Sequence, residues 1–161
     1  MGRSMSIVAL AGLAAVLAAG AAHSQERPNY SASPTYGTVN LSAGFTSDPW
    51  VVPVTSGGSL PASNISSSCS GYIARAPDVR LRYQAGDYPL ILSVAADSDT
   101  TLVVNGPDGN WYCDDDGGVN GLNPALRFGS PRSGQYDIWI GSYRSGTNLP
   151  ARLHISEVSS Q

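Results

Sequence analysis

The chain has 161 residues, a net charge of −3 at neutral pH, 18 glycines, 11 prolines and no lysine. Glycine, proline, serine and aspartate favour turns, whereas lysine and glutamate, which favour helices, are absent or scarce. This composition predicts many short strands joined by tight turns. An acidic chain with no basic cluster excludes nucleic-acid binding.

Residues 1–24 have the three parts of a secretion signal. Arg3 gives a positive start, residues 7–19 are almost wholly apolar, and Ala22 and Ser24 are small residues placed for cleavage before Gln25. Nearby small residues offer alternative cleavage points. The apolar stretch is shorter than the about 20 residues that span a bilayer, so an uncleaved anchor is the less favoured alternative. We expect an exported protein, periplasmic or extracellular, with no membrane-spanning segment after cleavage.

The rest of the chain repeats one pattern. Residues 25–35 have no hydrophobic period and are predicted to form a flexible lead-in. From 36 to 158, short runs of strand-forming residues alternate with clusters of turn residues, which predicts one all-β sandwich domain. The expected strands are residues 36–41, 50–54, 79–83, 89–95, 100–105, 110–114, 125–128, 135–141 and 151–158.

Alternation within these runs assigns side chains to faces. Ile138 and Ile140 are expected to face the core with Tyr136, which leaves Trp139 on the opposite face. The run 90–92 is apolar on both faces, as in a central strand.

A turn is predicted at residues 106–109 (GPDG), because proline fits its second position and glycine its fourth. It should close a hairpin in which Leu102 lies opposite Cys113, give or take one residue.

Cys69 and Cys113 are the two cysteines of the sequence. In an exported protein an even pair is most simply a disulfide. A reactive thiol is the less favoured alternative, because no histidine or lysine lies nearby in the sequence to lower its pKa.

Acidic residues gather at the end of the expected hairpin that lies far from its turn. Several carboxylates at one loop end repel unless neutralised, and calcium accepts six to eight oxygen ligands in loose geometry. The alternative is a solvated acidic loop, with carboxylates in local turns or paired with Arg127. The candidate calcium ligands are Asp97, Asp99, Asp114, Asp115, Asp116 and Asn120.

Aromatic residues offer a second candidate site. Trp111 and Tyr112 occupy opposite faces of one expected strand, so one of them points away from the core, as Trp139 does. Exposed rings could stack on sugars or bind an extended ligand. The alternative, which we favour for the outward tryptophan, is that a loop covers it.

A catalytic triad is not predicted. A serine hydrolase needs a histidine to take the serine proton, and His23 belongs to the signal. His154 falls on the polar side of the last expected strand, where it is interpreted as a surface residue. No Gly-x-Ser-x-Gly motif occurs. The scarcity of histidine also disfavours zinc.

Residues 100–116 (TTLVVNGPDGNWYCDDD) followed by 133–140 (SGQYDIWI) resemble the bacterial pre-peptidase C-terminal (PPC) domain family. That family combines an apolar strand, a "pDG" turn, an acidic patch and an "sGxYxhxV" element before its last strands. The likeness covers roughly residues 70–158. With its opening at 36–45 (YGTVNLSAGF), the chain also resembles a group of short exported proteobacterial proteins that carry the label "peptidase S1".

The resemblance implies a jelly-roll-like antiparallel β-sandwich. In the family this domain is appended to secreted hydrolases, assists secretion or substrate attachment, and in some members binds calcium. The printed sequence holds no catalytic domain beside the sandwich. We therefore expect a non-catalytic exported module that binds a protein or an envelope or extracellular polymer, such as a polysaccharide. The alternatives are a secreted hydrolase, as the label suggests, and a purely structural envelope protein.

Overall fold

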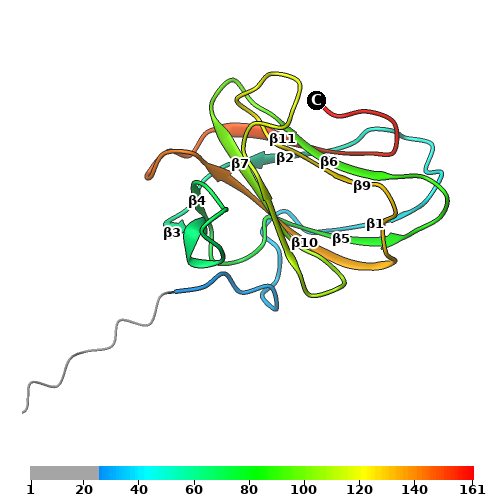
Figure 1. Ribbon diagram of the computed structural model, residues 1–161, viewed down its shortest axis with the longest axis horizontal. Helices are drawn as coiled ribbons and strands as arrows, with labels where there is room; N and C mark the ends of the chain where they lie inside the picture. The colour runs from blue at the N-terminus through cyan, green and yellow to red at the C-terminus, as the bar shows by residue number, and fades with distance from the viewer. Residues whose placement is uncertain (1–25) are drawn as a thin grey trace, which may run out of the picture.

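The structure, a computed structural model, describes residues 26–161 as a two-layer β-sandwich (Figure 1). This confirms the all-β fold that the sequence predicts. The predicted signal peptide lies outside the described residues. No helix in residues 26–161 is long and apolar enough to cross a membrane.

Sheet A has seven strands with β10 at its centre. One edge of β10 pairs with β5 and then with β4, and its other edge pairs with β7, which carries β8. β1 and β3 lie at the ends of the strand order. The strands are β1 (Thr38–Ser42), β3 (Leu60–Pro61), β4 (Tyr72–Ile73), β5 (Val79–Gln84), β7 (Thr100–Asn105), β8 (Trp111–Asp114) and β10 (Gly134–Ser142).

Sheet B has four strands in the order β2-β11-β6-β9. β6 and β11 are internal, which agrees with the continuous apolar run predicted at residues 90–92. The strands are β2 (Trp50–Thr55), β6 (Leu90–Ala95), β9 (Ala125–Phe128) and β11 (Pro150–Ser156).

One strand pair departs from the antiparallel expectation. β1 and β5 run parallel, with Thr38 beside Arg80 and Ser42 beside Gln84. A parallel pair needs a long crossover connection. Here the chain crosses to sheet B through β2 and returns through β3 and β4 before it forms β5. The sequence analysis did not predict β3 and β4, which are two residues long.

The main core fills the space between the sheets, and alternation along the strands supplies it. Ile138, Ile140 and Tyr136 of β10 point into this core as predicted, and each is at least 99% buried. Leu102 and Val104 of β7 lie beside them. Because these residues recur at every second position, one face of β10 is committed to the core.

The predicted turn at residues 106–109 forms. Gly109 has a φ of 78°, which is why glycine suits this position, and the Gly106 N–H bonds the Asn110 carbonyl at 2.9 Å. Leu102 pairs with Asp114, which differs by one residue from the predicted partner Cys113. The prediction allows a shift of one residue.

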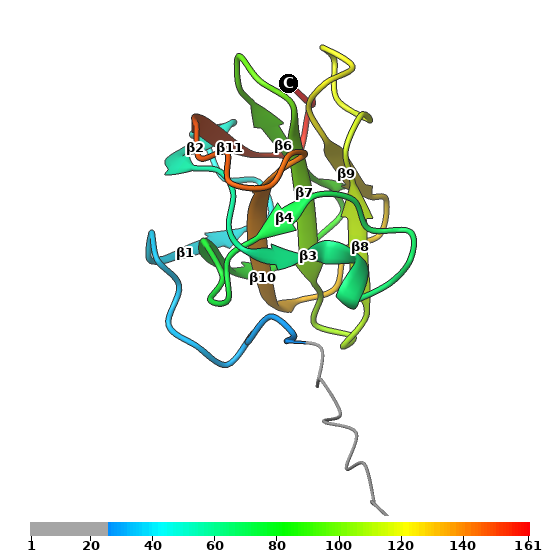
Figure 2. The ribbon, with the colours of Figure 1, turned by 90° about the vertical axis from the view of Figure 1, so that its left-hand side faces the viewer.

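One end of sheet A folds over the outer face of its own strands as a covering layer. Residues 59–74 form β3, a short 3-10 helix, η1 (Ala62–Asn64), and β4, and lie across β7 and β8 (Figure 2). Gly58 allows this path, since a Cβ there would overlap the backbone of Ile73. The layer encloses a second apolar cluster that consists of Leu60, Ala62, Cys69, Ile73, Val103 and Trp139.

Asp78 fills a gap in the strand pairing along one edge of β10. β10 pairs with β5 up to Ile138 and with β4 only at Ser142. In the gap, the Asp78 carboxylate accepts the Ile140 N–H at 2.7 Å and the Ile140 carbonyl accepts the Gly57 N–H at 2.9 Å. Burial of Asp78 raises the pKa of its carboxyl to about 7, against the opposing effect of the Ile140 hydrogen bond.

Candidate functional site

An open groove runs along the outer face of sheet A where β1, β5 and β10 lie side by side. Its volume is about 490 Å³. The register places Asn40 beside Arg82 and Arg82 beside Gln135, so the three side chains form a row across the strands. The groove is lined by Asn40, Leu41, Ser42, Arg82, Tyr83, Gln84, Gly134 and Gln135.

The groove combines neutral hydrogen-bonding groups with one cation. Asn40, Gln84 and Gln135 carry amides, and the Ser42 hydroxyl donates to Gln84 Oε1 at 3.3 Å. Arg82 is exposed, and no carboxylate within residues 26–161 lies at ion-pair distance from it. Among the described residues, none that lines the groove is acidic. Its chemistry therefore favours a ligand with hydrogen-bonding groups and a negative charge.

The neighbouring arginine is already occupied. Arg80 Nε donates to Asp137 Oδ1 at 2.7 Å, and both side chains are largely buried. Its Nη2 donates to the carbonyls of Tyr30 and Ala32 at 2.6 and 3.0 Å. The segment that the sequence predicts to be a flexible lead-in is thus hydrogen bonded to sheet A. Arg82 is the arginine of β5 that faces solvent.

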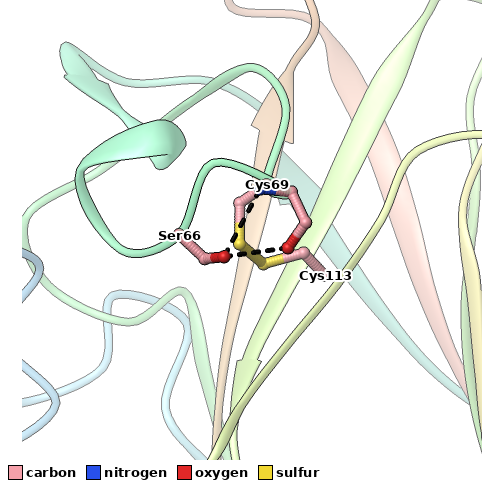
Figure 3. The surroundings of a disulfide bond; sticks show 4 residues. Ser66, Cys69 and Cys113 are labelled. Carbon is pink, nitrogen blue, oxygen red and sulfur yellow. Dashed lines mark hydrogen bonds between the residues drawn. A yellow bond between two sulfur atoms is a disulfide. The ribbon is translucent and has the colours of Figure 1, made fainter.

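The predicted disulfide is present. Cys69 and Cys113 are bonded, with Cα atoms 5.3 Å apart (Figure 3). The Cys69 N–H also donates to the Ser66 carbonyl at 3.0 Å. The disulfide fastens the covering layer to β8, beside the second apolar cluster.

The covering layer buries part of the predicted aromatic site. Trp139 is fully buried, so it is not available to stack on a ligand, because the covering layer lies over it. Trp111 is partly buried between Trp139 and Tyr30, with ring centroids 5.3 and 6.3 Å away. Tyr112 faces the main core, packs edge-on against Phe128 and donates its hydroxyl to Asp108 Oδ2 at 2.6 Å.

The predicted calcium ligands are only partly brought together. Asp114 is committed to the local backbone, because its Oδ2 accepts the Gly117 and Ala125 N–H groups at 2.7 and 2.9 Å. Burial raises the pKa of Asp99, and so do the nearby charges of Asp116 and Asp115. Asp97 and Asn120 are exposed. Within residues 26–161 no three Asp, Glu, His or Cys side chains are arranged to hold a metal ion. Calcium binding therefore stays a prediction.

His154 is not the surface residue that the sequence suggested. It is 9% exposed, and neither ring nitrogen has a hydrogen-bond partner in the described structure. Burial, followed by the charge of Arg152, lowers the pKa of its imidazole. The nearby Ser156 hydroxyl accepts the N–H groups of Val158 and Ser159, and the cross-strand Ser93 hydroxyl accepts the Gln161 N–H. Within residues 26–161 no serine hydroxyl is hydrogen bonded to the His154 imidazole, so the structure shows no Ser–His pair at this histidine.

The sequence analysis missed the groove. Its signal was available in the alternation of residues 79–83, which places Arg80 and Arg82 together on the outer face. The pattern could not predict that Arg80 pairs with Asp137, or that β1 lies parallel to β5. Both depend on contacts distant in sequence.

Comparison with known proteins adds little to this description. No protein-family model matches the sequence, and no curated protein matches it. The structure is similar to the crystal structure of Aeromonas hydrophila PliG, a periplasmic lysozyme inhibitor of g-type lysozyme. The identity is 15%, the TM-score is 0.37, and the match covers 74% of this chain and 96% of that chain. A likeness of this size carries no argument about function.

Proposed function

We propose that this protein is an exported, non-catalytic binding module that attaches to an envelope or extracellular partner through the groove on sheet A. The observation that carries the proposal is the row of Asn40, Arg82 and Gln135, which offers hydrogen bonds and one unpaired positive charge on an open surface. The open groove differs from the concave pockets that enclose small molecules, and therefore suits a large partner.

The resemblance to PPC domains supports the same proposal. An accessory module of that family would attach its host to a substrate or assist its export. The disulfide supports an oxidising location outside the cytoplasm.

The proposal is tested by retention on isolated envelope material. Protein with its disulfide intact is incubated with a sedimented envelope fraction, and the bound share is measured for wild type, Arg82→Gln and Gln135→Ala. We expect retention of the wild type and a several-fold loss in both variants, with Arg127→Gln on sheet B as the matched control. Equal retention of all four proteins would contradict the proposed surface.

The hydrolase alternative is tested separately with casein and small esters as substrates. We expect no turnover above background, and no difference between wild type and His154→Gln. Turnover that a single serine-to-alanine change abolishes would replace the binding proposal with an enzymatic one.

A further inference from the structure

β1 presents an unpaired backbone edge beside the groove. Toward β5, the Gly37 carbonyl accepts the Arg80 N–H at 3.1 Å and the Ala43 N–H donates to Gln84 at 2.8 Å. Bonding direction alternates along a parallel strand. The N–H and C=O groups of Thr38, Asn40 and Ser42 therefore point away from β5. All three residues are exposed, and β1 is the last strand in the order of sheet A.

The edge of sheet B on the same side of the molecule is protected in ways that β1 is not (Figure 2). β2 contains Pro53, which removes one donor, and the hydroxyl of Tyr36 accepts the Thr55 N–H at 2.9 Å. β1 (TVNLS) has neither proline nor a charged residue. Proline, charged residues or a covering segment normally protect an edge strand from pairing. An unprotected edge can accept another strand.

We propose that β1 binds an extended peptide segment of a partner protein, as an added strand, with an acidic side chain of that segment bound by Arg82. The inference rests on the proposed function and names the partner of the same surface. Strands lie about 4.8 Å apart. A side chain opposite Asn40 therefore lies two strand spacings from β5, within reach of a long guanidinium. The Asn40 amide can donate to the same carboxylate, whereas the Gln135 amide lies on the far side of β5 and donates to Asp137 Oδ2 at 2.7 Å.

Charge complementarity selects an acidic partner over a second copy of this chain. Two β1 strands paired with each other would place two Arg82 side chains on one face. The sequence TVNLS has no carboxylate to neutralise them. A partner strand with glutamate or aspartate supplies the charge that the groove lacks.

The test uses the whole disulfide-bonded protein, labelled with ¹⁵N, and a blocked pentapeptide, acetyl-Thr-Val-Glu-Val-Thr-amide. Two further peptides serve as controls, one with glutamine in place of glutamate and one with N-methyl groups at alternate amides. We expect the glutamate peptide to shift the backbone amide signals of residues 38–42. The glutamine peptide should bind roughly threefold more weakly, the value typical of an exposed ion pair. The methylated peptide should not bind.

Variants of the protein test whether Arg82 is the residue that binds the peptide carboxylate. Arg82→Gln should bind the glutamate and glutamine peptides equally, whereas Arg127→Gln should still prefer the glutamate peptide. Amide shifts that lie away from β1, or equal affinity of the wild type for both peptides, would overturn the inference. So would a dimer that shifts the β1 amides in the absence of peptide. If envelope retention still depends on Arg82 while the peptides fail, the proposed function stands and strand addition is wrong.

Discussion

The two faces of β10 bury their apolar residues in two different ways. Ile138 and Ile140 enter the main core, which both sheets build from strands with regular alternation. Trp139, between them, enters the second cluster, which residues 59–74 cover with two short strands, one helical turn and a disulfide. The first core depends on sheet packing alone. The second depends on a covering segment that has little regular structure and one covalent attachment.

Removal of the disulfide is expected to give the largest effect on this comparison. The bond joins residues 44 positions apart, and a closed loop of that length stabilises a fold by about 4 kcal/mol. We expect the Cys69→Ala/Cys113→Ala protein to lose about that much free energy of unfolding in urea. Its tryptophan emission should shift to the red in the native baseline, because the layer over Trp139 loosens. An unchanged emission maximum would show that the second cluster holds without the bond.

Substitution of one leucine in each cluster tests whether only the second cluster depends on the disulfide. Leu153 lies in the main core and Leu60 in the second cluster, and both are at least 95% buried. Each Leu→Ala change should cost about 3 kcal/mol in the disulfide-bonded protein. In the protein without the disulfide, the cost of Leu60→Ala should fall by about half or more, while that of Leu153→Ala should not change. Equal behaviour of the two leucines would mean that the clusters unfold as one unit.

The pH dependence of stability probes Asp78, whose carboxylate accepts the N–H of the core residue Ile140 in β10. Its carboxyl has a folded pKa of about 7, above the ordinary value of 3.8. Between these values the folded state holds a proton that the unfolded state has released, so this group makes stability rise as pH falls. We expect a gain of about 2 kcal/mol from pH 7 to pH 5 relative to Asp78→Asn, measured by urea unfolding. The comparison with Asp78→Asn removes the opposite contribution of His154, whose lowered pKa destabilises the protein in acid.

The smallest effect is expected at the acidic loop. Asp116→Asn should raise Tm by about 2 °C, because it removes a negative charge that acts on the partly buried carboxylate of Asp99. Millimolar calcium should raise the Tm of the wild type more than that of the variant. A calcium effect of equal size in both proteins would rule out a role for Asp116 in binding the ion.

Sequence reasoning found the main core and missed what lies outside it. Alternation fixed the faces of Ile138 and Trp139, and the GPDG turn fixed the hairpin that follows β7. Residues 59–74 have no regular alternation of apolar and polar residues, so their sequence did not predict a covering layer. The burial of His154 and the pairing of Arg80 with Asp137 arise from neighbours distant in the sequence. The cysteine pair was the one sequence feature that pointed to a long-range contact.

The strand order has a consequence for how this domain matures. The strands that join each sheet, β10 in sheet A and β11 in sheet B, come last in the chain. Until they arrive, β5 has no link to β7, and β2 has no neighbour in its sheet. The β1–β5, β6–β9 and β7–β8 pairs can form earlier, but neither sheet is continuous without β10 and β11. The closed sandwich therefore forms only when the last two strands of the chain have joined their sheets.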